Sequence, residues 1–340
     1  MKKAAIVASA AHLPERELTN EELARELGGA WTPEKIFEKT GIRSRRIAEP
    51  DECASDLGVR AAQKLFDRGV CGPQDVDYLL FCTQSPDYFL PTTACLVQQR
   101  LGLATSCGAI DFNQGCSGFV YGLSLAKSLI EAGLAGNVLL ITADTYSKFL
   151  NTRDRSVRTV FGDAGAATLI RATDSESDLL GPFVFGTDGR GAENLIVRAG
   201  GLRTPLTAAS FEEHEDNSGN WRSDANLYMN GPEIFNFTLS KLPKAIASLL
   251  QKSEQTLDDV DYFIFHQANQ FMLDRLRSKL SIPPEKFCVD LEWCGNTVSS
   301  TIPIALERAA AAGIVRPGMQ VMLVGFGVGY SWAAAMMRAS

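Results

Sequence analysis

Two apolar stretches in opposite halves of the chain repeat each other. "VDYLLFCTQ" begins at Val76, and "VDYFIFHQA" begins at Val260. A second pair, "NVLLITADTYS" and "QVMLVGFGVGYS", recurs at nearly the same offset, with Val138 matching Val321. Buried strands resemble one another because all are rich in Val, Ile and Leu. Chance resemblance does not explain a nearly constant offset, so we interpret the chain as an internal duplication.

A third pair extends the duplication. "IDFNQGCSG" and "VDLEWCGNT" place Cys116 and Asn296 at almost the same separation as the first two pairs. Two copies are too few for a solenoid, which needs at least three repeats, so they indicate two fused halves related by a pseudo-twofold axis. We expect residues 1–174 to form an N-terminal half that carries Cys116, and residues 175–340 to form a C-terminal half that carries His266 and Asn296. Corresponding strand ends of such halves should converge on one central site.

The segments around these repeats indicate an α/β protein. "AAQKLFDRGV" precedes "VDYLLFC", and "AKSLIEAGLAG" precedes "NVLLITAD", so helical patterns alternate with apolar β-branched runs. Runs that are apolar throughout are typical of strands covered on both faces.

The composition excludes several classes of protein. The chain is 45 % apolar and 21 % charged with a net charge of −7, so no basic field would attract nucleic acid or an anionic membrane. The N-terminal "KAAIVASAA" is too short for an export signal and is more typical of a buried strand. We therefore expect a cytoplasmic protein. No apolar run approaches about 18 residues, so we expect no membrane span. The eight cysteines lack paired spacing, which predicts reduced thiols and no metal site.

Cys116 follows a tight turn at the start of a predicted helix. Gly115 and Gly118 lie on either side of it, and the apolar residues that follow have a helical period. The free N–H groups and dipole of a helix N-terminus would stabilise a thiolate by up to about 2 kcal/mol. We therefore expect a reactive thiol with a pKa of roughly 7. A structural cysteine at a helix start is the alternative.

His266 and Asn296 are the candidate partners of this thiol. His266 ends the strand "VDYFIF", at the position that Cys82 occupies in the first half. Asn296 follows Cys294 and Gly295 and precedes a predicted helix that admits Pro303 only near its first turn or at a kink. The alternatives are a buried core histidine and an asparagine that only caps a helix.

The order Cys, His, Asn supports two chemistries. In a papain-like hydrolase, histidine deprotonates cysteine and asparagine orients histidine. In acyl transfer to carbon, the cysteine takes an acyl group from a thioester, and the other two side chains donate hydrogen bonds to a second, carboxylated thioester. Loss of CO2 would then leave an enolate oxygen that two neutral donors stabilise. The missing C-G-S-C-W surround and the duplication favour the second.

The chain resembles the thiolase-like condensing enzymes, and most closely the β-ketoacyl-acyl-carrier-protein synthase III family. The resemblance extends over nearly the whole chain and includes "TGIRSRRIA", "LPTTACLVQQRLG", "GCSGFVYGL", "FGDAGAA", "MNGPEIF", "HQAN" and "GFGVGYSWA". It implies a five-layered αβαβα fold, a homodimer and decarboxylative condensation of an acyl thioester with a malonyl thioester through an acyl-cysteine. The partners would be acyl-coenzyme A and an acyl-carrier protein, with no metal or redox cofactor.

The same resemblance assigns residues. Cys116 would be the nucleophile, His266 and Asn296 would polarise the malonyl thioester, and the backbone N–H of Val328 would complete an oxyanion hole. The remaining positions would contact coenzyme A, pantetheine or the acyl chain: Lys35, Lys39, Thr40, Leu90, Arg155, Met229, Gly231, Phe235, Asn269 and Phe326.

Three positions depart from the family pattern. Lys35 stands where many members have a tryptophan that stacks on adenine, and Phe271 stands where many have a carrier-docking arginine. Leu90 replaces the usual phenylalanine before Pro91, at the end of the partner subunit's acyl pocket, which would admit longer or branched acyl groups. A pathway-specific ketosynthase or an acyltransferase of secondary metabolism is therefore the alternative function on the same fold.

Overall fold

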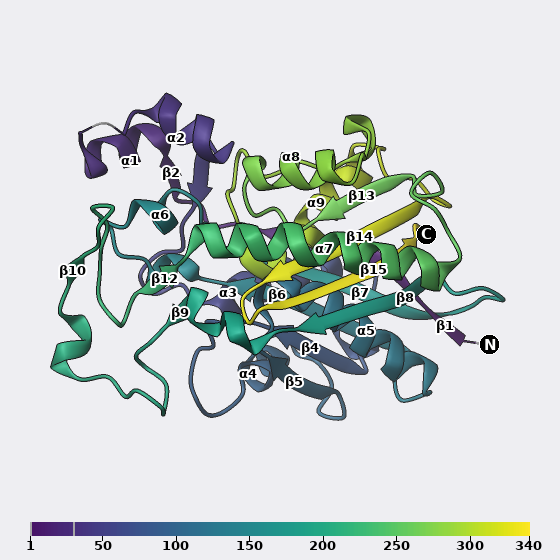
Figure 1. The fold of residues 1–340 in the computed structure, drawn as a ribbon. Coiled ribbons are helices and arrows are strands. Elements are labelled where there is room, and N and C mark those ends of the chain that lie inside the picture. The colour runs from purple at the N-terminus through teal and green to yellow at the C-terminus, as the bar shows by residue number, and fades with distance from the viewer. Residues whose placement is uncertain (1, 30) are drawn as a thin grey trace.

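The computed structural model describes residues 2–29 and 31–340 and contains two central sheets (Figure 1). The first sheet has the order β1-β7-β6-β4-β5. Its strands are β1 (Lys2–His12), β4 (Tyr78–Cys82), β5 (Gly108–Phe112), β6 (Asn137–Asp144) and β7 (Ala164–Asp174). β4 pairs in parallel with β5 and β6, and β7 is antiparallel to both β6 and β1. The expected first buried strand is thus β1.

The second sheet repeats this plan. Its order is β13-β14-β15-β8, with β8 (Leu180–Thr187), β13 (Tyr262–Phe265), β14 (Gln320–Gly327) and β15 (Ser331–Arg338). β13 and β14 are parallel, as β4 and β6 are, and β15 is antiparallel to both of its neighbours, as β7 is. The repeated sequence pairs therefore occupy matching strands, β4 with β13 and β6 with β14.

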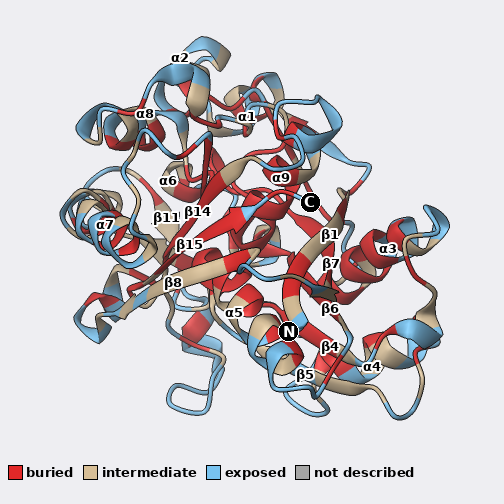
Figure 2. Cartoon of the chain, turned by 90° about the vertical axis from the view of Figure 1, so that its right-hand side faces the viewer, coloured by how far each residue is buried: buried red, intermediate tan, exposed pale blue. Residues whose placement is uncertain are grey.

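Helices form three layers around the two sheets. α5 (Gly118–Glu131) and α9 (Thr301–Ala311) lie between the sheets and contact strands of both. α3 (Ala54–Asp67) and α4 (Thr93–Arg100) cover the outer face of the first sheet, and α7 (Gly231–Ser253) covers that of the second. α8 (Gln270–Lys279) packs beside α7. Figure 2 shows the buried strands and the buried faces of α5 and α9 at the centre.

Close packing in the central layer depends on small residues. Gly122 of α5 faces Leu140 of β6 so closely that an added Cβ would lie 2.5 Å from the Leu140 Cδ1 atom. The helix can therefore approach the sheet only where a side chain is missing. This approach fixes the N-terminus of α5, which follows Cys116.

Smaller elements surround one end of the two sheets. They are β2 (Glu17–Thr19), α1 (Asn20–Leu27), α2 (Pro33–Thr40), β3 (Ser44–Arg46), α6 (Arg155–Arg158), β9 (Leu195–Val197), β10 (His214–Glu215), β11 (Trp221–Arg222) and β12 (Leu227–Met229). The buried Arg45 donates to the Thr159 carbonyl and to Asn20 Oδ1, which ties the α1–α2 region to the first half.

Over residues 2–29 and 31–340, no helix combines the length and the apolar character that a bilayer crossing requires. The eight cysteines are free thiols.

Candidate active site

Cys116 lies in the 3-10 turn η2 (Gly115–Ser117), directly before α5, so the predicted helix N-terminus is correct. Gly115 has a φ of 53°, a conformation that favours glycine. A Cβ at this position would collide with Gln84 Oε1 and would lie 2.7 Å from the Val328 Cγ1 atom. The turn therefore needs glycine both for its backbone conformation and for the close approach of its neighbours.

The expected pKa of Cys116 is wrong. The side chain is 4 % exposed, and burial followed by the nearby Asp144 carboxylate raises the thiol pKa to about 12. The backbone N–H groups of Val328 and of Cys116 itself lower the pKa, as expected for a helix terminus, but by less. The side chain of Cys116 is therefore a neutral thiol. The expected pKa of roughly 7 took account of the helix N-terminus but not of the cost of burying a thiolate away from water.

His266 follows β13 and is 2 % exposed. Its Nδ1 atom lies 2.7 Å from the Thr301 hydroxyl, which in turn lies 3.1 Å from the Val298 carbonyl. Burial lowers the pKa of the imidazole to about 3, against a smaller opposing contribution from the Val298 carbonyl. The ring is therefore neutral, and the Phe326 ring stands edge-on to it at 5.3 Å between centroids.

Asn296 is held through its backbone and its side chain. Its N–H donates to the Val160 carbonyl at 2.9 Å, and its carbonyl accepts from the Gly162 N–H at 3.0 Å. Its Oδ1 atom accepts from the Val298 N–H at 2.9 Å, which leaves the amide NH2 as the group that donates to a ligand. Val298 has a φ of 55°, which is rare for a β-branched residue and costs about 1–3 kcal/mol.

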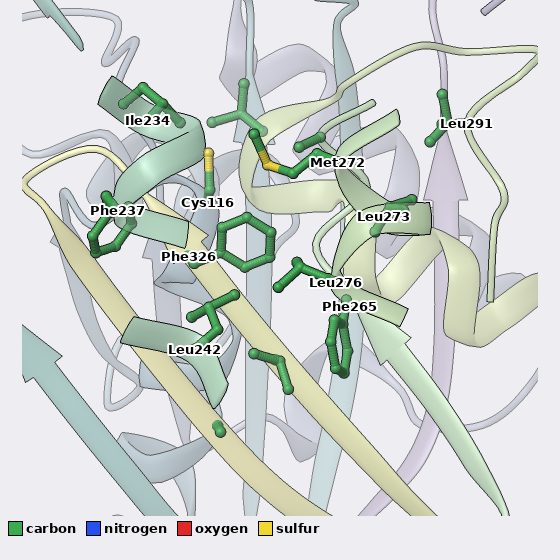
Figure 3. Packing of buried hydrophobic residues seen from close by; sticks show 14 of the residues in the cluster. Cys116, Ile234, Phe237, Leu242, Phe265, Met272, Leu273, Leu276, Leu291 and Phe326 are labelled. Atoms are coloured by element: carbon green, nitrogen blue, oxygen red, sulfur yellow. The ribbon is translucent and has the colours of Figure 1, made fainter. Parts of the chain in front are cut away.

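The three candidate residues converge around the short turn η7 (Val298–Ser300). Asn296 precedes this turn, Thr301 follows it and contacts His266, and η7 contacts the η2 turn of Cys116. Figure 3 shows Cys116 beside Phe326 of β14, facing apolar side chains from α7 and α8. A buried thiol, a neutral imidazole and an amide are therefore brought together around η7.

β14 ends against Cys116. A Cβ at Gly327 would lie 2.9 Å from the Cys116 Sγ atom, and one at Gly325 would lie 2.7 Å from the Ser117 Cα atom. The sequence repeats show Gly327 at the position of Asp144 in the other half. The reason for a glycine here is visible only in the packed structure.

A tryptophan that sequence reasoning missed lies at the expected nucleotide end. The Trp31 ring centroid is 5.6 Å from Lys35 Nζ, 5.7 Å from Lys39 Nζ and 5.7 Å from the Arg155 guanidinium carbon. The regular four-residue spacing of Trp31, Lys35 and Lys39 in the sequence is the signal that would have grouped them. Arg155 also donates to the Ser218 carbonyl and to Asn220 Oδ1.

The other residues predicted to contact the substrate lie on several elements. Phe235 of α7 stacks on Phe271 of α8 with ring centroids 5.5 Å apart, and a Cβ at Gly231 would meet nothing within 4 Å. The Thr40 hydroxyl donates to the Ile36 carbonyl at 2.7 Å, and Asn269 Oδ1 caps α8 by accepting from the Met272 N–H. Met229 ends β12 and is half-buried, whereas Leu90 is 87 % exposed in a loop before α4.

In the described part of the chain, no three His, Cys, Asp or Glu side chains gather in a geometry that could hold a metal ion.

Comparison with known proteins decides the family. The family model described as 3-oxoacyl-[acyl-carrier-protein (ACP)] synthase III matches residues 110–189, and the model of its C-terminal part matches residues 250–339. The β-ketoacyl-[acyl-carrier-protein] synthase III of Caldanaerobacter subterraneus subsp. tengcongensis is 35 % identical over 335 residues, which are 98 % of this chain and 97 % of the relative.

The chain belongs to the 3-oxoacyl-acyl-carrier-protein synthase III family.

Solved structures of synthase III proteins share the fold. A crystal structure of a 3-oxoacyl-(acyl-carrier-protein) synthase III is 56 % identical, covers 99 % of both chains and has a TM-score of 0.98. The priming β-ketosynthase of the R1128 polyketide biosynthetic pathway is 28 % identical, covers 99 % of this chain and 96 % of its own, and has a TM-score of 0.85. The predicted five-layered thiolase-like fold of duplicated halves is confirmed.

Membership of the synthase III family also confirms the predicted enzyme class and reaction. The chain is a condensing acyltransferase, and the expected decarboxylative condensation of an acyl thioester with a malonyl thioester is its function. The alternative of a papain-like cysteine hydrolase finds no support in these relatives. The division of the chain at residues 174 and 175 and the roles of the individual site residues stay predictions.

Proposed function

We propose that Cys116 carries the acyl group during the condensation and that His266 and Asn296 hold the malonyl thioester. The observation that carries this proposal is the convergence of a buried thiol, a neutral imidazole and an amide around η7. Two neutral donors suit a thioester oxygen that gains negative charge during decarboxylation.

In the first step, the Cys116 sulfur attacks the carbonyl carbon of an acyl thioester, and the acyl group moves to the cysteine. Because Cys116 is a neutral thiol, its proton passes through neutral His266 to the leaving sulfur, which departs as a thiol. The N–H groups of Cys116 and Val328 face the sulfur and would stabilise the oxyanion of this step.

In the second step, the carboxylate of the malonyl thioester leaves as CO2, and the electron pair moves toward the thioester oxygen. His266 Nε2–H and the Asn296 amide would donate to this oxygen, each donor being worth roughly 3–4 kcal/mol. The Thr301 hydroxyl can accept from or donate to His266 Nδ1, so the ring can supply Nε2–H here and accept a proton in the first step. The enolate carbon then attacks the acyl-cysteine and releases the 3-oxoacyl thioester.

We propose coenzyme A as the carrier of the first acyl group. Trp31 offers an aromatic face, and Lys35, Lys39 and Arg155 around it offer positive charge to phosphates. Lys35 occupies the position of the family's tryptophan, but Trp31, four residues earlier in the sequence, supplies an aromatic ring in its place. The reaction needs no metal or redox cofactor, since coenzyme A and phosphopantetheine thioesters enter as substrates.

We propose that an acyl-carrier protein delivers the malonyl group at the same entrance. α2 and α8 lie side by side there (Figure 1), and they carry Lys35, Lys39 and Arg275 in a chain whose net charge is −7. Arg275 lies over the Phe271 ring at 5.2 Å, which presents an apolar and cationic pair to an acidic partner.

We propose that the active form is a homodimer. β5 is an edge strand of the first sheet, and Ile110 on it is 40 % exposed. Tyr88, Phe89 and Leu90 are also exposed, and such a group of apolar side chains marks an interaction surface. Pairing of two β5 strands would cover the edge and direct Leu90 toward the acyl pocket of the second copy. We place the protein in the cytoplasm, where its free cysteines would stay reduced.

Intact-protein mass spectrometry and CO2 release test the proposal. Wild type incubated with acyl-coenzyme A should gain one acyl mass, which peptide mapping assigns to Cys116. Cys116→Ser should gain none, yet should still release labelled CO2 from a malonyl thioester, because His266 and Asn296 are intact. Acylation of a different residue, or no acylation of wild type by any donor, would contradict it.

A specialised role in a pathway other than fatty-acid initiation is the second candidate. Leu90 in place of phenylalanine favours it, because a flexible leucine admits larger acyl groups. A panel of acyl-coenzyme A donors of graded length and branching distinguishes the two. A preference for acetyl would support initiation, and a preference for longer or branched primers would support the specialised role.

A further inference from the structure

Asp144 is a buried carboxylate that the proposed reaction does not use. It ends β6 and has no exposed surface. Its Oδ1 atom accepts from the Gln84 N–H at 2.8 Å. Its Oδ2 atom accepts from the Ser299 N–H at 3.3 Å and from the Ser299 hydroxyl. One carboxylate therefore binds two separate loops, one from each half of the chain.

The first of these loops leads to the nucleophile. The Gln84 side chain packs against Gly115, at a position where a Cβ on Gly115 would collide with Gln84 Oε1. The Tyr146 hydroxyl donates to the same oxygen and holds the side chain in place. A shift of Gln84 would therefore move the turn that carries Cys116.

The second loop leads to both donors. Ser299 is the middle residue of η7, which begins shortly after Asn296 and is followed by Thr301. Because Thr301 contacts His266 Nδ1, a shift of η7 would change the positions of both side chains that face the malonyl thioester. Val298, with its positive φ, shows that the loop does not adopt this shape at low energy without support.

The duplication explains why the carboxylate is present in only one half. Asp144 and Gly327 occupy matching positions at the ends of β6 and β14. At Gly327 the missing side chain leaves room for the Cys116 sulfur. At Asp144 the matching space holds a side chain that binds η7.

We propose that Asp144 is a positioning residue that joins the Cys116 turn to the loop of Asn296 and Thr301. The inference rests on the proposed role of Cys116 as the acyl carrier.

Several titratable groups surround the Asp144 carboxylate. Besides burial, the Asp144 carboxylate raises the pKa of Cys82 from β4, of Cys116 from η2 and of Tyr146 from the turn after β6. Asp163, before β7, raises the pKa of Asp144. Burial raises the pKa of Asp144 to about 7, against the hydrogen bonds from Ser299 and Gln84. Asp144 is the charged group that most raises the pKa of Cys116 after burial itself.

The test compares Asp144→Asn with a matched control. Asp163 is equally buried and accepts from the Ser147 N–H, the Ser147 hydroxyl and the Ala48 N–H, but it does not bind η7 or Gln84. Asp163→Asn therefore reproduces the loss of a buried carboxylate with three donors. Acylation of wild type at Cys116 is measured first, so that a failure of the proposed function is recognised separately.

Asp144→Asn should change two steps in opposite directions. Removal of a neighbouring negative charge should speed iodoacetamide alkylation of Cys116 at neutral pH about tenfold and move its pH midpoint downward. Condensation turnover should fall at least about tenfold, because Asn replaces one of the two accepting oxygens with an NH2 donor, so either the Gln84 or the Ser299 contact is lost. Ser299→Ala keeps the carboxylate and loses the hydroxyl donor, so condensation should fall.

Asp163→Asn should lower the melting temperature but keep the condensation rate within about twofold of wild type. The pH midpoint of alkylation should not change. The proposal is overturned if Asp144→Asn retains condensation, or if it slows alkylation, acylation and condensation together as a general loss of structure would. If Asp144→Asn does not fold, unchanged condensation in Ser299→Ala overturns the proposal.

Discussion

Gly327 and Cys116 are packed so closely that a Cβ on the glycine would lie 2.8 Å from the cysteine Cβ and 2.9 Å from its sulfur. The end of β14 is therefore in contact with Cys116. Because Val328 is the next residue, its backbone N–H is directed at the sulfur. Gly327 thus provides the space for the thiol, and Val328 provides the donor beside it.

Replacement of this glycine should block acylation. In Gly327→Ala the new methyl group would displace the Cys116 side chain, and a displacement of about 1 Å can cost on the order of 100-fold in rate. We expect acyl-enzyme formation, followed by intact mass, to slow by about that factor. Gly189→Ala is the control, since a Cβ there meets nothing within 4 Å. Normal acylation of Gly327→Ala would show that the sulfur has another accessible position.

The neutrality of His266 should be visible in the pH dependence of stability. Burial lowers its pKa to about 3 in the folded chain, whereas the unfolded chain takes up the proton near 6.5. Between these values the unfolded state binds more protons, so the contribution of His266 to stability is full above about 6.5 and is lost as the pH falls toward 3. His266→Asn should therefore lose less unfolding free energy between pH 7 and pH 4, by at most about 3 kcal/mol.

Urea unfolding at several pH values measures this difference. His12→Asn is the comparison, because burial, Lys64 and Arg60 lower the pKa of His12 to about 4, outside the active site. Both variants should flatten the stability curve, but only His266→Asn should also reduce decarboxylation of the malonyl thioester. An unchanged curve for His266→Asn would mean that the imidazole is not desolvated as described.

Trp31 should contribute to the binding of coenzyme A thioesters and not to the binding of shorter thioesters. Stacking of a base on an aromatic side chain is worth about 1–3 kcal/mol. Trp31→Ala should therefore raise KM for an acyl-coenzyme A at least about fivefold. KM for the matching acyl-pantetheine, which has no nucleotide, should not change, and Trp31→Phe should restore part of the loss. Equal losses for both substrates would point to a role of Trp31 in folding the α1–α2 region.

Disruption of the β5 edge should separate the proposed dimer. In Ile110→Lys a charge would occupy the exposed edge of the first sheet, which opposes pairing with a second copy. Light scattering after gel filtration should show a monomer, with acyl-chain selectivity changed by the loss of the second copy's Leu90. Leu134→Lys, at another exposed apolar position, should leave the mass unchanged. A wild type that is monomeric at assay concentration would contradict the proposal.

Several features of the molecule could be read from the chain alone. The nearly equal offsets between Val76 and Val260 and between Val138 and Val321 predicted two halves, because duplicated strands keep their order and spacing. The glycines around Cys116 and the periodic apolar residues after it predicted a helix start, because both signals are local. The correspondence of Cys116 with Asn296, and of Cys82 with His266, followed from the same offset.

Other features depend on residues that only the packed structure brings together. The residues next to Cys116 in sequence predicted a reactive thiol, but burial and Asp144 make it a neutral one, and both effects arise from distant parts of the chain. The position of Trp31 beside Arg155 and the link from Asp144 to Ser299 likewise join segments far apart in sequence. The chain alone therefore determined which chemical groups occupy the strand ends, whereas tertiary packing decided their protonation and spacing, because desolvation and long-range contacts exist only in the folded state.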